Sequence, residues 1–205
     1  MRFEFDWVDA FSDVVFGGNG CAVVHGGADV EEAVCKAYVR ETSLVECTFT
    51  GPPDVADIRV RYLLASREIP LAGHPTVATP PALPAPALVQ DGGLTLETQA
   101  GVVQAEVQGT KVTMTQMAPE FGPQVPADIV AAVGGISAGD IIAPPQVVST
   151  GLPFCVTLLR DRATLDSLKL DTMALKAMGD HLQQPDINMM EPFWVTQPGA
   201  TASGD

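Results

Sequence analysis

The chain has 205 residues, enough for one or two domains that each bury a core. Its residues are 46% hydrophobic and 18% charged, which is typical of a globular protein and not of a disordered one. The 11 basic and 25 acidic residues give a formal net charge of −14, which argues against non-specific binding to nucleic acids or to anionic membranes. A small anionic substrate is not excluded, because a local pocket can reverse the field of the surface.

The cysteines and histidines are scattered along the sequence. The four cysteines form no CxxC pair, and the three histidines stand at positions 25, 74 and 181. We therefore expect reduced, buried thiols, no metal site and a cytoplasmic protein. The first nine residues include three acids, and no apolar run approaches the ~18 residues of a membrane span. We expect neither a secretory leader nor a membrane segment.

The first part of the chain predicts the order strand, turn, strand, helix, strand, strand. A strand over 3–8 alternates apolar and polar residues, and the Asn-Gly turn of 16–20 leads into a short buried strand. A helix follows, with its apolar stripe on Val30, Val34, Ala37 and Tyr38. The predicted ranges are a strand over 3–8, a turn over 16–20, a strand over 21–25, a helix over 30–40, and strands over 46–51 and 57–65, the last with outward arginines.

The second part predicts hairpins, and then a change of composition. We expect strands over 94–99, 101–109 and 111–116, with a tight turn at the sequence QGTK. The Pro- and Gly-rich stretch 117–126 predicts a boundary between domains of residues 1–117 and 118–205. The second domain is expected to hold helices over 127–133, 163–168 and 172–182, strands on both sides of a Ser-Thr-Gly turn within 144–161, and a strand over 193–199. Antiparallel hairpins with single helices favour an α+β class over a doubly wound parallel sheet.

The sequence Gly73-His74-Pro75-Thr76 is the first candidate for chemistry. Glycine permits close approach of another molecule to the backbone, and proline suits the first turn of a helix. The unbonded N–H groups of such a helix start attract carboxylates. The alternative is a proline-rich loop with one isolated histidine. The other histidines, His25 and His181, are expected at the surface.

Glu46 is the second candidate. It stands where the predicted helix gives way to a strand, among apolar neighbours such as Val45 and Cys47. A partly desolvated carboxylate has a raised pKa and suits general acid and base catalysis. An exposed acid at the end of a strand explains the same position equally well.

Three stretches in this order resemble the phenazine-biosynthesis PhzF-like family: FDWVDAFSDVVFGGNGCAVV, RETSLVECTF and IRVRYLLASREIPLAGHPTVAT. Later stretches, AGVVQAEVQGTKVTMTQMAPEFG and STGLPFCVTLLRDRATLDSLKLD, match the family's style, so the resemblance covers nearly the whole chain. It implies a fold similar to diaminopimelate epimerase: two α+β domains, each a mixed, barrel-like sheet around a central helix, with the active site in the cleft between them.

The resemblance also implies a cofactor-independent isomerase or epimerase that moves a proton on a small cyclic or amino-acid carboxylate. Glu46 corresponds to the family's acid/base residue, and His74 would assist it. Gly73, His74, Pro75 and Thr76 would form the substrate-binding start of the central helix, with Asn19 as a further contributor. Neither a metal nor a cofactor is implied.

The chain departs from the family pattern in two places. Pro80, Pro81, Pro84 and Pro86 predict that the central helix stops near Thr79 or is badly kinked, because an interior proline costs about 3 kcal/mol. The family's late D-P-A-T-G-S-A-like motif has no match, which predicts a C-terminally truncated, incomplete second domain. We therefore expect a homodimer or a completing partner chain. The alternative function is that of a non-catalytic homologue that binds small molecules or acts in assembly.

Overall fold

The computed structural model describes residues 2–83, 92–183 and 191–197. Spatial contacts divide the chain into two compact units, Met1–Gln116 and Met117–Asp205. The boundary expected from the sequence lies one residue later, after position 117. Each unit is described by itself. Among the described residues, no helix has the length and apolar character needed to cross a bilayer.

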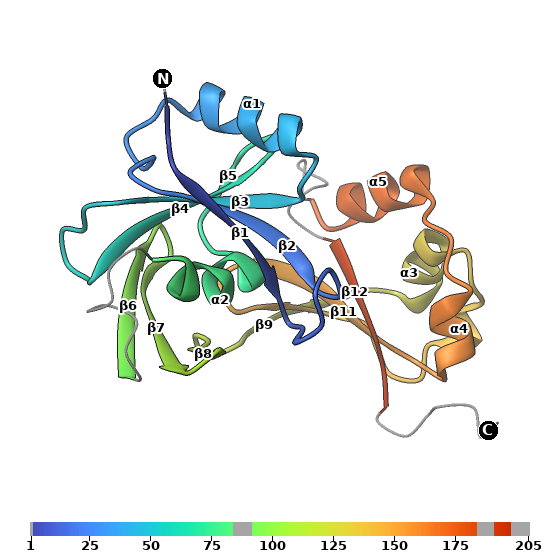
Figure 1. Cartoon of the computed structure of the whole chain (residues 1–205). Helices are drawn as coiled ribbons and strands as arrows, with labels where there is room; N and C mark the ends of the chain where they lie inside the picture. Colours follow the sequence, from blue (N-terminus) through green and yellow to red (C-terminus); the bar gives the residue numbers. More distant parts are fainter. Residues whose placement is uncertain (1, 84–91, 184–190, 198–205) are drawn as a thin grey trace. The chain divides into compact units, whose positions relative to one another are not determined.

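The described strands of the first unit form one eight-stranded mixed sheet (Figure 1). Its order is β1-β2-β3-β4-β6-β7-β8, and the short β5 pairs with β4. The β2/β3 and β4/β6 pairs are parallel, and the other pairs are antiparallel. The strands are β1 (Phe5–Ala10), β2 (Asn19–Val24), β3 (Glu46–Gly51), β4 (Ile58–Leu64), β5 (Glu68–Ile69), β6 (Gly92–Thr98), β7 (Gly101–Gln108) and β8 (Lys111–Thr115).

Helices α1 (Glu32–Thr42) and α2 (Gly73–Ala82) cover opposite faces of this sheet (Figure 1). Successive side chains of a strand point to opposite faces, so each central strand serves both helices. On β2, Cys21 and Val23 pack with α2, whereas Ala22 and Val24 pack with α1. The sheet curls so that β1, β2, β3, β7 and β8 all contact α2, which makes it the central helix of the unit.

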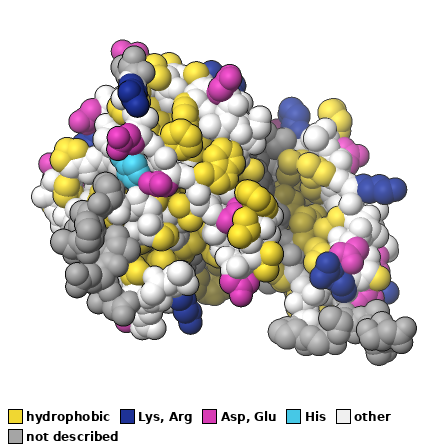
Figure 2. All heavy atoms as spheres, viewed as in Figure 1, with side chains coloured by type: hydrophobic (Ala, Val, Ile, Leu, Met, Phe, Trp, Pro, Cys, Tyr) yellow, Lys and Arg dark blue, Asp and Glu magenta, His cyan; other side chains and the backbone are white. Residues whose placement is uncertain are grey.

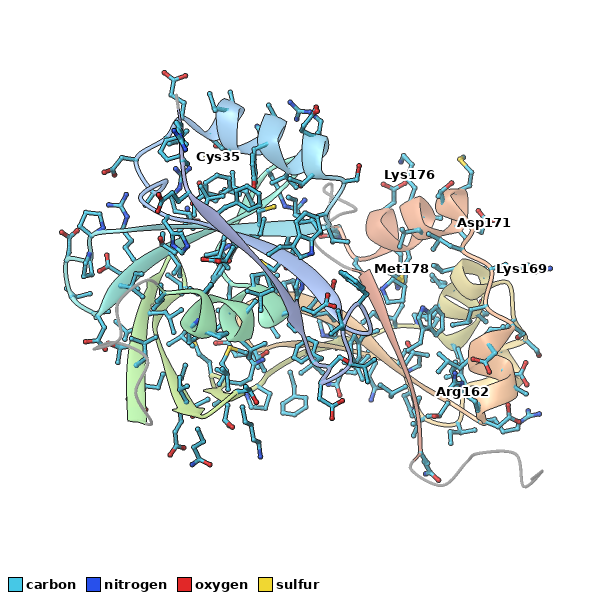
Figure 3. All side chains as sticks on the ribbon, viewed as in Figure 1. Cys35, Arg162, Lys169, Asp171, Lys176 and Met178 are labelled. Atoms are coloured by element: carbon cyan, nitrogen blue, oxygen red, sulfur yellow. The ribbon has the colours of Figure 1, made fainter. Side chains whose placement is uncertain are left out.

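The buried stripe of α1 differs from the predicted one. Cys35 and Val39 are fully buried, and Tyr38 packs beside them, but Val34 is 45% exposed. The stripe prediction was therefore wrong for Val34 and Ala37, which are exposed, whereas Val30 and Tyr38 pack against the core. Cys35, which packs as a small apolar residue, was not included in the predicted stripe. Figure 3 labels Cys35 on the side of α1 that faces the sheet.

The arginines of β4, predicted to point outward from the strand, are held by hydrogen bonds. Arg61 forms two hydrogen bonds with Glu68, of 2.9 and 2.6 Å, and Arg59 lies 2.6 Å from Asp29. Both arginines also donate to the carbonyl of Ala28. These contacts fix the backbone at Ala28 against β3 and β4.

Helix α2 continues through Pro80 and Pro81 to Ala82, so the predicted stop near Thr79 is wrong. The two prolines remove only the N–H groups that would bond the carbonyls of residues 76 and 77. Burial offsets that loss, since Ala78 and Ala82 pack against β1 and β2 in one apolar cluster. The helix ends at Leu83, whose extended backbone is the one favoured before a proline. Pro84 and Pro86 lie outside the described residues.

The second unit carries a four-stranded sheet in the order β12-β11-β10-β9, among the residues described. Its core joins Val130 and Val133 of α3 to Met178 of α5 and Cys155 of β11. Figure 3 labels Met178 on the inner side of α5 and Lys176 on its outer side. The elements are β9 (Glu120–Gln124), α3 (Ala127–Gly134), η1 (Ala138–Asp140), β10 (Gln146–Ser149), β11 (Pro153–Leu159), α4 (Arg162–Asp166), α5 (Thr172–His181) and β12 (Glu191–Thr196).

The connection between β1 and β2 exposes large apolar side chains. Phe11 and Phe16 have positive φ angles of 67° and 60° and are 75% and 90% exposed. Figure 2 shows apolar side chains gathered over the β1–β2 hairpin of the first unit. An apolar surface of this kind is typical of a contact surface.

A steric test of the first unit is available at Gly51, at the end of β3. A Cβ atom at this position would lie 2.5 Å from the Cβ of Ala28, whose backbone is held by Arg59 and Arg61. We expect Gly51→Ala to lower the free energy of unfolding by about 1–3 kcal/mol in chemical denaturation. Gly93→Ala is the matched control, because a Cβ on Gly93 of β6 would meet nothing within 4 Å. Equal stability of the two variants would contradict this packing.

Candidate active site

The two-residue period of β3 places Glu46 on the face of the sheet that carries α2. Cys47 and Phe49 pack with α1, so Glu46, Thr48 and Thr50 turn the other way. Thr48 and Thr50 are buried below the helix, while the Glu46 side chain, at the end of the strand, is 17% exposed. Glu46 is thus a mostly buried acid that retains an opening to solvent.

The start of α2 brings His74 against Glu46. The His74 Nδ1 atom lies 3.3 Å from Glu46 Oε2, and the imidazole is 8% exposed. The N-cap residue, Ala72, offers no side chain that could bond the first N–H groups, and the first turn contains no acid. The N–H groups of Gly73 and His74 therefore have no acceptor within the helix.

Gly73 presents bare backbone to solvent. It is exposed, and a Cβ built on it would meet nothing within 4 Å. Pro75 and Thr76, by contrast, are buried, and the Thr76 hydroxyl bonds inward to the carbonyl of Ala72. Of the predicted binding segment, the backbone of Gly73 faces outward, whereas the buried side chains of Pro75 and Thr76 support it from below.

Asn19 lies at the same end of the sheet. It is exposed, and it precedes Cys21 by two residues on the face of β2 turned toward α2. Its neighbour Gly20 hydrogen-bonds through its backbone to His74. The first unit therefore brings Asn19, Glu46 and the Gly73–Thr76 segment together.

Burial governs the ionisation of this region. It lowers the pKa of His74 below the ordinary 6.5, although the hydrogen bond with Gly20 partly opposes this. The Glu46 carboxylate, 3.3 Å away, favours the charged imidazole, but burial is the larger effect. Burial also raises the pKa of the Cys21 thiol to about 12, so Cys21 is a neutral neighbour. His74 is accordingly a neutral imidazole at pH 7.

The other two histidines are not part of this group. His25 was expected at the surface, but its side chain is only 15% exposed and lies 2.7 Å from Asp6 of β1. His181 is exposed at the end of α5. Among the described residues, no group of three or more His, Cys, Asp or Glu side chains is arranged to hold a metal ion.

Several residues of the site region were missed in the sequence. Beneath the Glu46–His74 pair lie four buried hydroxyl groups, from Thr48, Tyr62, Thr76 and Thr79, which bond in two pairs between the sheet and α2. The signal that could have found them is the alternation in β3 and β4, which assigns Thr48 and Tyr62 to the face of Glu46. Threonines three residues apart in a helix also lie on one side of it.

Comparison with known proteins identifies the family. The family model described as phenazine biosynthesis-like protein, PhzC-PhzF, matches residues 8–193. The chain belongs to this family. It is 31% identical over 211 residues to the uncharacterised isomerase YddE of Salmonella typhimurium, covering 97% of this chain and 69% of that one.

Two further proteins extend this comparison. The chain is 34% identical over 175 residues to the trans-2,3-dihydro-3-hydroxyanthranilate isomerase of Pseudomonas aeruginosa, covering 82% of this chain and 61% of that enzyme. A PhzF-family crystal structure from Bacillus anthracis superposes with a TM-score of 0.76, at 24% identity, covering 96% of this chain and 68% of that one. The α+β fold of the diaminopimelate epimerase type is confirmed, as is the PhzF-like isomerase family. The incomplete second domain stays a prediction.

The lowered pKa of His74 makes stability depend on pH in a defined direction. Above about pH 7 the imidazole is neutral in both the native and the unfolded state. As the pH falls below the ordinary value of 6.5, His74 binds a proton in the unfolded state but not in the native state. The free energy of unfolding therefore decreases until the pH reaches the native pKa of His74. We expect His74→Gln to remove this part of the slope in denaturant titrations between pH 5 and 7. A slope that steepens in the variant would show that native His74 carries a raised pKa instead.

Proposed function

We propose that the protein is a cofactor-independent isomerase that moves a proton between carbon atoms of a small cyclic or amino-acid carboxylate. The observation that carries the proposal is the 3.3 Å contact between Glu46 and His74 beside a helix start whose N-cap residue, Ala72, makes no side-chain cap bond. An acid/base residue and an anion-binding backbone are thus adjacent in one unit. Membership of a family whose relatives include isomerases supports the same reaction class.

The substrate carboxylate would bind at the start of α2. The N–H groups of Gly73 and His74 lie in the first turn of α2 and point out of its N-terminal end. The helix dipole adds positive potential at this end. The missing side chain of Gly73 leaves room for close approach. Asn19, exposed at the same end of the sheet, would hydrogen-bond a polar substituent of the substrate.

Glu46 would carry the proton. Its carboxylate removes a proton from a substrate carbon and becomes a carboxylic acid, which exchanges its proton with solvent through the opening beside it. It then returns a proton to a second carbon on the same face. The electron pair stays in the substrate, so no oxidant is required. Neutral His74 carries a single ring N–H, and in this proposal that group turns from the Gly20 carbonyl to the negative charge that develops between the two transfers. A buried site strengthens this bond, because little water competes for it.

Replacement of Glu46 tests the proton carrier. Glu46→Gln keeps the shape of the side chain, and we expect it to reduce turnover by about 10²–10⁴-fold. The measurement is solvent deuterium incorporation from D₂O into a panel of cyclic and amino-acid carboxylates, followed by NMR and mass spectrometry. Glu41→Gln, on the exposed side of α1, is the matched control. Unreduced turnover in Glu46→Gln would show that another group moves the proton.

Replacement of Gly73 tests the carboxylate site separately. Gly73→Ala has open space around the new methyl group and should fold normally. The methyl group would occupy the surface that the carboxylate approaches, so we expect affinity for a stable aromatic carboxylate such as 3-hydroxyanthranilate to fall about tenfold, measured by calorimetry. Affinity equal to that of the wild type would place the anion elsewhere.

The names of the relatives suggest a class of substrate, small cyclic or amino-acid carboxylates, and not a single compound. One of them is named for a hydroxylated cyclic amino acid, so we include such compounds first in the panel. The homodimer or completing partner chain, and the cytoplasmic location, stay predictions. Sedimentation analysis would test the first of these directly.

A further inference from the structure

Two pairs of buried hydroxyl groups tie the first turns of α2 to the sheet. Tyr62 Oη lies 2.7 Å from Thr76 Oγ1, which donates to the carbonyl of Ala72 at 2.5 Å. Thr79 Oγ1 lies 2.7 Å from the carbonyl of Pro75 and 3.2 Å from Thr48 Oγ1. All four hydroxyl-bearing residues are at most 1% exposed. The contacts are therefore permanent parts of the interior.

The protons of these groups have a restricted arrangement. The single proton of Thr76 points to Ala72, so Tyr62 must be the donor in the Tyr62–Thr76 pair. The proton of Thr79 lies between the Pro75 carbonyl and Thr48. One pair thus connects Tyr62 of β4, through Thr76, to the carbonyl of Ala72. The other connects Thr48 of β3, through Thr79, to the carbonyl of Pro75.

These two carbonyls bracket the candidate active site. Ala72 directly precedes Gly73 and His74, and Pro75 directly follows them. On the sheet side, Thr48 is two residues from Glu46 on the same face of β3. The hydroxyl pairs consequently join the helix segment that carries His74 to the strand that carries Glu46.

Stability alone is a weak reason for this arrangement. Replacing both members of a buried hydroxyl pair with apolar groups of the same shape is often close to neutral for folding. Phenylalanine and valine would fill nearly the same volume at these positions. A hydrogen bond between hydroxyl groups, however, fixes the distance and the direction between the two side chains more closely than apolar packing does.

We propose that Tyr62 and Thr79 are positioning residues that set the place of His74 relative to Glu46 and to the uncapped backbone of Gly73. The inference rests on the function proposed for that pair. Neither residue touches the substrate in this proposal. They act by holding the carbonyls of Ala72 and Pro75, and with them the short segment between, in one place.

The experiment compares Tyr62→Phe and Thr79→Val with two matched controls. Thr50→Val removes a buried hydroxyl from the same face of β3 that bonds only to the carbonyl of Val24 among its described contacts. Tyr38→Phe removes a buried hydroxyl that has no hydrogen-bond partner in the described part of the chain. Thr79→Ser keeps the hydroxyl and serves as the rescue variant. Thermal unfolding of each variant verifies that the native fold is retained.

Two readouts are taken on every variant. The first is the NMR titration of the His74 imidazole, assigned with His25→Gln and His181→Gln. The groups that face His74 are Glu46, the backbone of Gly20 and the neutral Cys21 thiol, so the midpoint reports its position among them. The second is kcat and KM for deuterium incorporation into the best carboxylate of the panel.

We expect the His74 midpoint to move up toward the ordinary value in Tyr62→Phe and Thr79→Val, because a looser helix start admits water to the ring. We expect kcat to fall about 10- to 100-fold with KM changed less than about threefold, since a displacement below 1 Å impairs chemistry more than binding. Thr79→Ser should restore both values, and the two controls should match the wild type.

The outcomes separate this inference from the proposed function. An unchanged His74 midpoint in both variants, or equal changes in Thr50→Val, overturns the positioning role. If the wild type exchanges no carboxylate of the panel while the midpoint moves in Tyr62→Phe and Thr79→Val only, the positioning role stands and the proposed function is wrong for that panel.

Discussion

The alternation of side chains along β3 is the constraint on which the first unit depends. One strand supplies apolar residues, Cys47 and Phe49, to the α1 face and polar residues, Glu46 and Thr48, to the α2 face. A shift of the strand by one residue would exchange the two sets and bury Glu46 under α1. The parallel pairing with β2 and the antiparallel pairing with β4 together fix this register, because each restricts it independently. The place of the acid is thus decided by the packing of the whole sheet.

The face beneath α2 is unusual because it is both buried and polar. Buried hydroxyl groups cost free energy unless they are bonded, and here Thr48, Tyr62, Thr76 and Thr79 are bonded to one another or to helix carbonyls. Their mutual satisfaction keeps water out of the interior beside the apolar cluster that α2 forms with β1 and β2. The same exclusion of water lowers the pKa of His74 and keeps it neutral beside Glu46. A neutral donor next to a carboxylate suits the proton transfer at carbon that is proposed for this pair.

The sequence predicted the strands and the candidate pair well, but it predicted less of how they are supported. Glu46 opens the strand predicted over 46–51, and His74 lies in the second position of α2, because short-range patterns and turn residues determine both. The length of α2 was not predictable from its prolines, since burial of Ala78 and Ala82 depends on strands distant in sequence. The bond between Tyr62 and Thr76 was equally hidden, because it requires the register of β4 against the helix. Local rules located the elements that carry Glu46 and His74, whereas tertiary packing determined the contacts that support them.

The strongly negative chain and the proposed carboxylate ligand are compatible for a local reason. Helices α1 and α3 carry an acid in their first turn, and α4 and α5 begin with an aspartate cap, so each of these starts is already neutralised by the chain itself. Helix α2 has neither, and near its start Glu46 of β3 contacts the imidazole of His74. In the proposed function the positive end of its dipole attracts the substrate carboxylate. A carboxylate bound there would lie beside Glu46, and the repulsion between the two anions would favour the protonated form of Glu46 once the substrate proton has been taken. Binding of the carboxylate at the start of α2 would then favour proton transfer to Glu46, because the two negative groups lie close together.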